Sequence, residues 1–411
     1  MDRQTLKKKR NKGPEPRSTL SVDGWVSLRR RHYHSGGEGT TTPSDELLDA
    51  AHNTLSVATR QLCVELNRAS RSFEMTADHL RRAAQLSLST ETLRQAVEAD
   101  GKAALKLAGS GELEPTWHAS QCKRPDGKSL VYLNSDGFMA PTITDAEKQS
   151  RRRKVMEKRS RRQGVKPRLR QVKRGTDQRY KEFKAVMFYD HEMEHRQVSD
   201  FGELSRAVTR GDCRSAGRLM SRDAWRLGFA AADDRVGNID GGPWIINQIR
   251  RRKLKMTAVG LDFYHLSENV NKSKAKAKPP RRIVFGEKSP RGEQQAKDLL
   301  HTVKHEGYEP MRAKLMDLRH QTRGIRRKEM DRLIEYVSDR REMIRYPQFL
   351  ANNWQIGIGP MESRCGVLPC RIKGQGKRWD RDNADAVMTL EAMHQSGQAP
   401  AYWRLALSGQ N

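Results

Sequence analysis

SLVYLNSDG, Ser129–Gly137, is the stretch that decides the fold of this chain. It is a short apolar run that ends in Asp136-Gly137, a residue pair typical of the turn after a strand. Two further apolar stretches follow, FKAVMFYD (183–190), which alternates in polarity, and MTAVGLD (256–262), which is typical of a buried strand. Helical patterns precede and follow these strands. We therefore expect an α/β fold in which Asp136 ends the first strand of a central sheet.

The charge of the chain limits its partners. Lys and Arg number 79 against 50 Asp and Glu in 411 residues, a formal net charge of +29. A field of this sign points to nucleic acid and, less well, to an anionic membrane. No apolar run approaches the ~20 residues that span a bilayer, and the N-terminal MDRQTLKKKRNKG lacks the apolar core of a signal peptide. We expect a cytoplasmic protein with no membrane partner.

The N-terminal part divides into a tail and a helical region. Residues 1–18 are rich in Lys, Arg and Pro, a composition typical of a basic disordered tail. Residues 19–127 are expected to be mostly helical. Two short amphipathic patterns separated by QLSLS, with Ser89 as the N-cap of the second, fit a helix-turn-helix at 75–99. The same spacing also fits an ordinary helical hairpin.

Two strongly basic segments interrupt the remaining pattern. Residues 148–174 and 271–282 are too charged to form a core. Together with the net charge they are interpreted as phosphate contacts, although solvated linkers have the same composition. Between residues 293 and 350 the sequence returns to long, charged helical patterns.

The sequence HEMEH, residues 191–195, fits the HExxH pattern of zinc proteases. In that mechanism His191 and His195 bind zinc and Glu192 is the general base, which needs a helix because only there do residues four apart share one face. Here the motif directly follows the strand FKAVMFYD, and on a strand the two histidines would lie about 13 Å apart. A zinc metallopeptidase is therefore the weaker alternative. The five cysteines form no CxxC pair, so they indicate no other zinc site.

Three acids stand at positions that could bring them together. Asp136 follows the first strand, Asp240 in NIDGGPWI follows another apolar run, and Glu362 in WQIGIGPMES opens a helix after two glycine turns. Singly, each has an ordinary explanation, since Asp-Gly is a hairpin signal and a first-turn glutamate stabilises the helix dipole. In a chain this basic, however, three convergent carboxylates can hold two Mg²⁺ ions about 3.5 to 4 Å apart around a phosphodiester.

The order of the motifs resembles that of bacterial insertion-sequence transposases. The closest likeness is to the Kra-type family, through the SDG at Asp136, DGGPWI at Asp240, DFYH (262–265) and IGIGPMES followed by RIKGQGKRW. The DxxH within DFYH is also similar to the C/DxxH signature shared with Mutator-like transposases. The likeness runs from SLRRRHYHSGGEGTTTPSDELLD near the N-terminus to the YW at residues 402–403, so it covers nearly the whole chain.

The resemblance implies a DDE triad with its metal ions. By position, Asp136, Asp240 and Glu362 would be the catalytic residues and the ligands of two Mg²⁺ ions, for which Mn²⁺ could substitute. Asp262 and His265 would be accessory residues close to the scissile DNA. An equal alternative keeps Asp262 as a structural acid at a strand end, with His265 simply packed.

The resemblance also implies a domain organisation. An RNase H-like core would occupy residues 128–265 and, with its final helices and a C-terminal tail, residues 354–411. A helical insertion at 266–353 would split this core. The region 19–127 would bind DNA.

The expected function is that of a DNA transposase. It would bind the terminal inverted repeats of its element, cleave the element ends and transfer the strands to target DNA by a two-metal DDE mechanism. It would act as a homo-oligomer on DNA in the bacterial nucleoid. The residues expected to contact DNA are Arg371, Lys373, Lys377, Arg378 and Trp379.

The chain departs from the family pattern at three positions around the glutamate. Ile358 stands where the family usually has serine, Lys377 stands in GKRW where GMRW is expected, and Pro369 would kink a usually continuous helix. These departures define the second alternative, a catalytically impaired or domesticated DNA-binding protein of the same fold.

Overall fold

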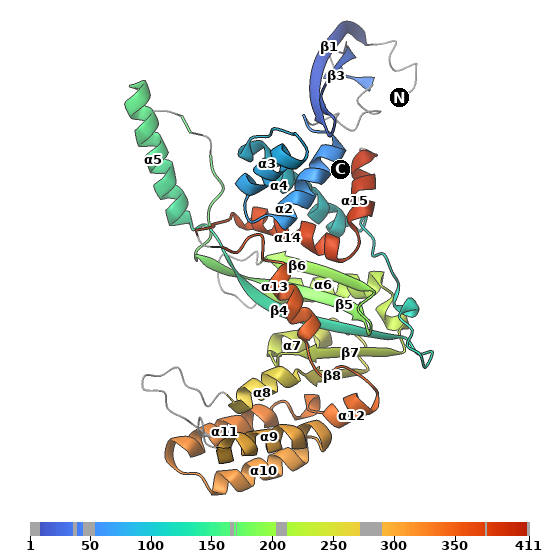
Figure 1. Cartoon of the computed structure of the whole chain (residues 1–411), viewed down its shortest axis with the longest axis vertical. Helices are drawn as coiled ribbons and strands as arrows, with labels where there is room; N and C mark the ends of the chain where they lie inside the picture. The colour runs from blue at the N-terminus through green and yellow to red at the C-terminus, as the bar shows by residue number, and fades with distance from the viewer. Residues whose placement is uncertain are drawn as a thin grey trace.

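The chain folds into layers arranged along one long axis. The computed structural model describes residues 9–35, 39–43, 54–164, 168–169, 171–202, 212–271, 290–374 and 376–408. Figure 1 shows a small sheet and a group of helices at the N-terminal end, a larger sheet in the middle, and a second group of helices at the far end. Within the described ranges, no helix has both the length and the apolar character needed to cross a membrane.

A mixed five-stranded sheet forms the centre of the molecule. The strands stand in the order β6-β5-β4-β7-β8. β4, β5 and β6 pair antiparallel, whereas β7 pairs parallel with β4 and β8 pairs parallel with β7. The strands are β4 (Leu130–Pro141), β5 (Tyr180–Asp190), β6 (Arg196–Gly202), β7 (Asp234–Ile239) and β8 (Ala258–Leu261). The predicted α/β class is confirmed.

The apolar run at the start of β4 is buried on both faces of the sheet. Leu130 and Tyr132 belong to one core cluster, and Val131 and Leu133 belong to another. Successive side chains of a strand point to opposite faces. A continuous apolar run is therefore what a strand covered on both sides requires.

Helices cover both faces of this sheet. On one face, α13 (Gly359–Val367) contacts β4, and α14 (Arg381–Gln395) contacts both β6 and α4. On the other face, α6 (Asp212–Arg226) packs on β5 and on α7 (Pro243–Arg251). The sheet is thus the middle layer of three.

β4 does not end at Asp136, as the Asp-Gly pair had predicted. Asp136 pairs with Ala185 and Gly137 with Lys184, and the pairing with β5 continues to the end of β4. The prediction was wrong because β5 is long enough to continue the ladder beyond Gly137. A Cβ at Gly137 would lie 2.3 Å from Glu182 Oε1, so the glycine serves a close cross-strand contact and not a turn.

A three-stranded antiparallel sheet begins the described chain. It consists of β1 (Arg10–Ser21), β2 (Gly24–Ser35) and β3 (Gly39–Thr41). The prediction of a disordered tail over residues 1–18 is therefore wrong from Arg10 onward, and residues 1–8 lie outside the described part of the chain. Prolines in β1 are tolerated because it is an edge strand, whose outer N–H groups need no ladder partner.

Helices predicted for the region 75–99 are present. They are α3 (Phe73–Ala83) and α4 (Thr90–Ser110), and both pack on α2 (Val57–Ala69). The predicted cap is confirmed, because the Ser89 hydroxyl accepts a hydrogen bond from the Thr92 N–H. α15 (Ala399–Leu407) contacts α2 and α14, so the C-terminal end of the chain joins the N-terminal helices.

The segment between β8 and α13 is helical, as predicted. Its described helices are α8 (Phe263–Asn271), α9 (Pro290–His305), α10 (Tyr308–His320), α11 (Gly324–Ser338) and α12 (Tyr346–Ala351). They share a core of their own, which includes Leu266, Leu299, Met311 and Leu333. The second predicted basic segment lies outside the described residues from position 272 onward.

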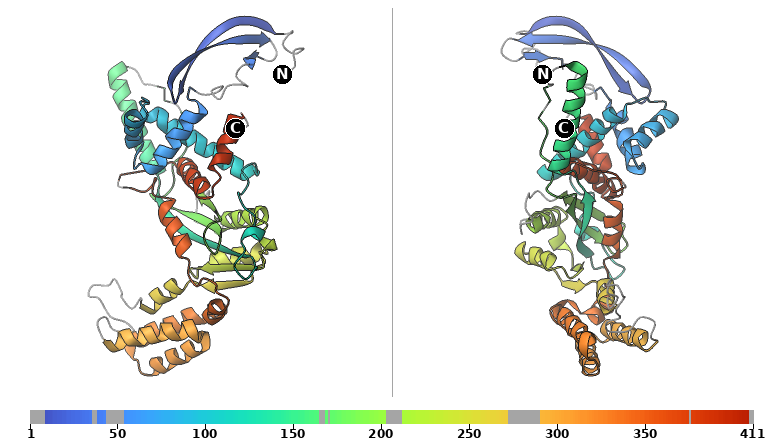
Figure 2. Two further views of the ribbon diagram at one scale, coloured as in Figure 1. Left: turned by 45° about the vertical axis from the view of Figure 1, so that its right-hand side comes forward. Right: turned by 90° about the vertical axis from the view of Figure 1, so that its left-hand side faces the viewer.

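α5 (Asp145–Gln163) lies between β4 and β5 in the chain and carries most of the first predicted basic segment. It extends away from the sheet in every view (Figure 1, Figure 2). Its N-cap is Thr144, whose side chain accepts the Glu147 N–H. The expectation that this segment lies outside the core is confirmed, because Lys148 is the only buried residue among positions 145–162 of α5.

Candidate active site

Three aspartates lie in one row across the central sheet. β4 and β7 pair with an offset of 104 residues, as Leu130 opposite Asp234 shows, and β7 and β8 pair with an offset of 22. If these offsets are extended beyond the paired residues, Asp136 within β4 lies beside Asp240, which follows β7, and Asp240 lies beside Asp262, which follows β8. Neighbouring strands lie about 4.8 Å apart, so the register gathers the three carboxylates at one place in the sheet.

Asp136 is half-buried in this row. The Gly137 N–H donates a hydrogen bond of 2.6 Å to its Oδ1. Burial raises the pKa of the Asp136 carboxyl, and the negative charge of Asp240 raises it further. The Cys365 thiol of α13 also hydrogen-bonds this carboxyl, which links the strand to the helix that carries Glu362.

Asp240 directly follows β7 and precedes α7. Its Oδ1 accepts the Gly242 N–H at 2.7 Å. A Cβ at Gly242 would lie 2.9 Å from that oxygen, and Gly241 has φ of +85°, so both glycines are needed for the chain to turn around the carboxylate. The GG of DGGPWI thereby positions the acid.

Asp262 is held by two elements at once. It follows β8 and is only 1% exposed. Its Oδ1 accepts the Ile358 N–H at 2.9 Å, and its Oδ2 accepts the His265 N–H at 2.7 Å and contacts His265 Nδ1 at 2.6 Å. Asp262 therefore ties α8 to the segment that leads into α13.

Glu362 lies in the first turn of α13, as predicted. Its side chain is 42% exposed and its Oε1 lies 3.9 Å from His265 Nδ1. Partial burial raises the pKa of the Glu362 carboxyl, and the charges of Asp262 and Asp136 add to this effect. The hydrogen bond to Asp262 raises the pKa of His265, and nearby Asp240 and Glu362 act in the same direction. The side chain of Glu362 thus lies within the electrostatic field of the aspartate row.

Three side chains at this place could hold a metal ion. Asp262, His265 and Glu362 each offer one ligand atom, and these atoms all lie within 4.8 Å of one another. Among the described residues, Asp136 and Asp240 are not part of this tightest group. They lie in the same row, and the oxygen-only set of Asp136, Asp240 and Glu362 is the better chemical match to a hard cation such as Mg²⁺.

A buried polar network holds the segment before α13 on the sheet. Asn238 of β7 donates Nδ2–H to the Gln355 carbonyl at 2.8 Å, and the Gln355 N–H donates to the Tyr132 hydroxyl at 3.0 Å. Asn134 accepts the Asn238 N–H at 3.0 Å and donates to the Tyr189 hydroxyl at 2.8 Å. These bonds fix the approach to Glu362, because residues 355–358 have no strand pairing to hold them.

Sequence reasoning missed this network, although a signal was present. Asn134-Ser-Asp136 and Asn238-Ile-Asp240 repeat the same spacing, with a fully buried asparagine two residues before each aspartate. A buried asparagine in an apolar strand needs hydrogen-bond partners for its amide. The two asparagines in the sequence therefore indicated a buried polar network beside the aspartates. Ile358, noted as a departure from the family, is fully buried in the main core.

The predicted DNA-contact residues separate into two groups. Arg371 and Trp379 are buried, so the prediction of direct contact is corrected for these two. Arg371 donates from Nε and Nη2 to Asn67 Oδ1 at 3.0 and 2.8 Å and stacks on Phe73. Burial lowers the pKa of Arg371 to about 10. The remaining three, Lys373, Lys377 and Arg378, reach the surface.

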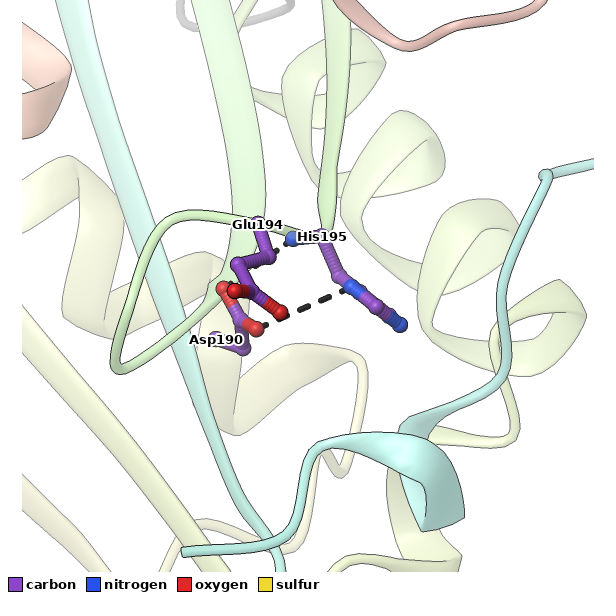
Figure 3. Close-up of side chains that lie close together, drawn as sticks. All are labelled: Asp190, Glu194 and His195. Atoms are coloured by element: carbon purple, nitrogen blue, oxygen red, sulfur yellow. Dashed lines mark hydrogen bonds and ion pairs between the residues drawn. The ribbon is translucent and has the colours of Figure 1, made fainter.

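The HEMEH motif does not form a zinc-protease site. Residues 191–195 make the turn between β5 and β6 and not a helix, so the geometry that the motif requires is absent. His191 contacts the Tyr132 hydroxyl at 3.3 Å. The acids that approach His195 are Asp190 and Glu194 (Figure 3), and Asp190 accepts the His195 N–H at 3.1 Å. This trio closes the hairpin.

No protein-family model matches this chain, and no curated protein matches its sequence. Its function is therefore argued from the side chains in the aspartate row and from the sequence motifs.

Proposed function

We infer that the protein is a DDE-type DNA transposase with an RNase H-like core. In such a core the first three strands form an antiparallel meander and the last two join in parallel beside the first strand. β4 to β8 follow this order and these directions, which supports the proposal. The triad acids also stand on the elements that this fold assigns to them, namely the first strand, the end of the fourth, and a helix after an insertion.

One observation carries the proposal. Asp136 and Asp240 are level on neighbouring strands, and Glu362, far away in sequence, comes through α13 into the electrostatic field of Asp136 and Asp262. Burial raises the pKa of the Asp136 and Glu362 carboxyls, and the neighbouring carboxylates raise it further, so a bound cation would favour their charged forms. The cluster of carboxylates is opposite in sign to the net charge of the chain, which is +29.

Each residue has a defined task in this function. Asp136, Asp240 and Glu362 would hold two Mg²⁺ ions, which activate the attacking oxygen and stabilise the leaving oxygen of a phosphodiester. Asp262 and Asn238 keep Glu362 in place, since they bind the backbone of residues 355–358, and Asn134 supports Asn238 by accepting its N–H. His265, next to Glu362, can donate a hydrogen bond to DNA at the same end of the site.

Replacing the helix-borne acid tests the proposal. The substrate is a supercoiled plasmid that carries the DNA flanking this gene, incubated with Mg²⁺ or Mn²⁺. We expect the wild-type protein to nick it, and Glu362→Gln to lower the rate by at least about 10²-fold while DNA binding persists, because an electrostatic contribution of this kind is lost. Asp240→Asn should act in the same way.

A matched control is Glu309→Gln, which removes an exposed glutamate from α10 and should leave the rate unchanged. Wild-type protein that binds the plasmid but never nicks it would support the impaired DNA-binding alternative. Undiminished nicking by the Glu362→Gln variant would contradict the triad.

A further inference from the structure

α5 is a long helix with few partners among the described residues. Its nineteen residues contain nine Lys and Arg against three Asp and Glu. At the start of the helix, Lys148 anchors it through an ion pair with Asp380 and a 2.9 Å hydrogen bond to the Lys173 carbonyl, and Arg152 donates to the Leu169 carbonyl at 3.1 Å. Most of the remaining side chains are charged and exposed, and a helix of this kind gains little from packing. Its basic surface is therefore open to a ligand from outside.

The cations of α5 are arranged in a way that is unfavourable for the isolated protein. Lys154, Lys158 and Arg162 follow one another at four-residue spacing, so they share a face and repel each other. All three are exposed, and none pairs with a carboxylate in the part of the chain that the structure describes. Lys154, Lys158, Arg161 and Arg162 also line one shallow hollow, with Glu157 as its single acid. A row of phosphates would relieve this repulsion.

A second cationic group continues from the base of α5 towards the aspartate row. A pocket of about 350 Å³ there is lined by Arg151 of α5 and by Lys377 and Arg378, and its two acids, Glu98 and Asp380, are outnumbered by these and two further arginines. Lys373 lies 5.5 Å from the ring centre of Phe138, which stands two residues after Asp136 on β4. Cations therefore extend from the strand of Asp136 to the end of α5.

We propose that α5 and the group Lys373, Lys377 and Arg378 form one track, called here the α5 track, that binds the DNA duplex flanking the cleavage site. The inference rests on the proposed function, because that function puts DNA at Asp136. α5 is about 28 Å long and one turn of B-DNA is about 34 Å, so the helix can reach phosphates over most of a turn measured along the duplex axis. Its nine cations amount to one per about 3 Å, close to the spacing of about 3.4 Å between the charges of one DNA strand.

The test neutralises one face of α5 and compares it with an equal change elsewhere. The track variant is Lys154→Gln, Lys158→Gln and Arg162→Gln. The control variant is Arg326→Gln, Arg327→Gln and Lys328→Gln, three exposed cations of α11 at the opposite end of the molecule (Figure 1). Both lose the same charge. Their side chains are exposed, so both variants should fold, which far-ultraviolet circular dichroism and thermal unfolding check.

Fluorescence anisotropy then measures binding of a labelled 40-base-pair duplex taken from the flanking DNA, in EDTA and at salt concentrations from about 50 to 200 mM. We expect the track variant to bind at least about tenfold more weakly than the control variant. Its slope of log K against log salt should be shallower by about 2.7, since three phosphate contacts are lost. Equal affinities and slopes for the two variants would overturn the α5 track.

Additional measurements distinguish a failure of the α5 track from a failure of the proposed function. Glu362→Gln should bind the duplex like the wild type in EDTA, because the α5 track lies outside the triad. A wild-type protein that nicks the plasmid but binds independently of α5 would overturn the α5 track alone. Failure of the wild type to bind any DNA would overturn both. Tighter, α5-dependent binding of a duplex RNA of the same length would overturn DNA as the occupant.

Discussion

Gly101 sits in the middle of α4, at the point where this helix is closest to α14. A Cβ at this position would lie 2.3 Å from the Ala386 carbonyl oxygen and 2.6 Å from its carbon. Both are backbone atoms, so they cannot move aside as a flexible side chain would. We expect Gly101→Ala to lower the free energy of unfolding by about 1 to 3 kcal/mol, since the two helices must separate. Urea unfolding followed by circular dichroism measures the change.

Gly109 provides the matched control in the same helix. It is exposed, and a Cβ there would meet nothing within 4 Å. Gly109→Ala should therefore stabilise the protein by about 0.5 kcal/mol through helix propensity alone. Equal changes of the same sign for the two substitutions would contradict the close contact between α4 and α14.

At the residue scale, the sequence predicted the positions of Asp240 and Glu362 better than the contacts that hold the site together. Asp240 and Glu362 stand after a strand and in the first turn of a helix, as expected, because Gly-Gly and Gly-Pro signals mark these places reliably. The partners of Asp262 could not be predicted. Ile358 reaches it through a backbone N–H, and any residue but proline at that position offers the same donor.

At the element scale, the first turn of α4 contains a titratable contact that links helix stability to pH. Arg94 donates two hydrogen bonds to Glu91, at 2.9 and 2.6 Å, and Gln95 donates a third at 2.7 Å. The bonds from Arg94, with that from Gln95, lower the pKa of Glu91 to about 2. The folded-state pKa is below the unfolded value of about 4.3, so this stabilisation exists above pH ~4.3 and is lost as pH falls towards 2.

Glu91→Gln should therefore destabilise the protein at pH 6 and progressively less as the pH approaches 3. The Glu91 side chain is 61% exposed, so solvent screening limits the difference to about 0.5 kcal/mol. Urea unfolding of both proteins at a series of pH values measures it. Glu306→Gln, which changes an exposed glutamate outside any ion pair of the described residues, is the control. A difference that grows on acidification would contradict the predicted sign.

The sequence failed to predict elements whose local composition favours a different structure from the one that tertiary contacts impose. β1 contains Pro14, Pro16 and many cations, which is the composition of a disordered tail, yet pairing with β2 along its whole length orders it. The helix predicted up to residue 99 continues as α4 to Ser110, and Gly101 within it allows the close contact with α14. Four strands of the central sheet were predicted, since burial makes their apolar runs recognisable, but β6 and the true end of β4 were not.

At the scale of the whole molecule, the proposed function assigns different ligands to the anionic site and to the cationic surface. The aspartate row lies in the central sheet, which Figure 1 shows between two groups of helices, and α5 extends from the same sheet. On this proposal the carboxylates bind metal cations and the basic surface binds DNA. It would account for the acids that a chain of net charge +29 keeps together in its centre.

The net charge predicts how the full-length protein responds to salt. If six or more phosphates are neutralised, the association constant for a duplex from the flanking DNA should fall by about 10³ between 50 and 200 mM salt, because condensed counterions are released on binding. Fluorescence anisotropy in EDTA measures this without cleavage. Glutamate in place of chloride controls for anion competition and should raise the affinity without removing the dependence. An association constant that hardly changes over this range would exclude the phosphate backbone as the main ligand, and with it the proposed action on DNA.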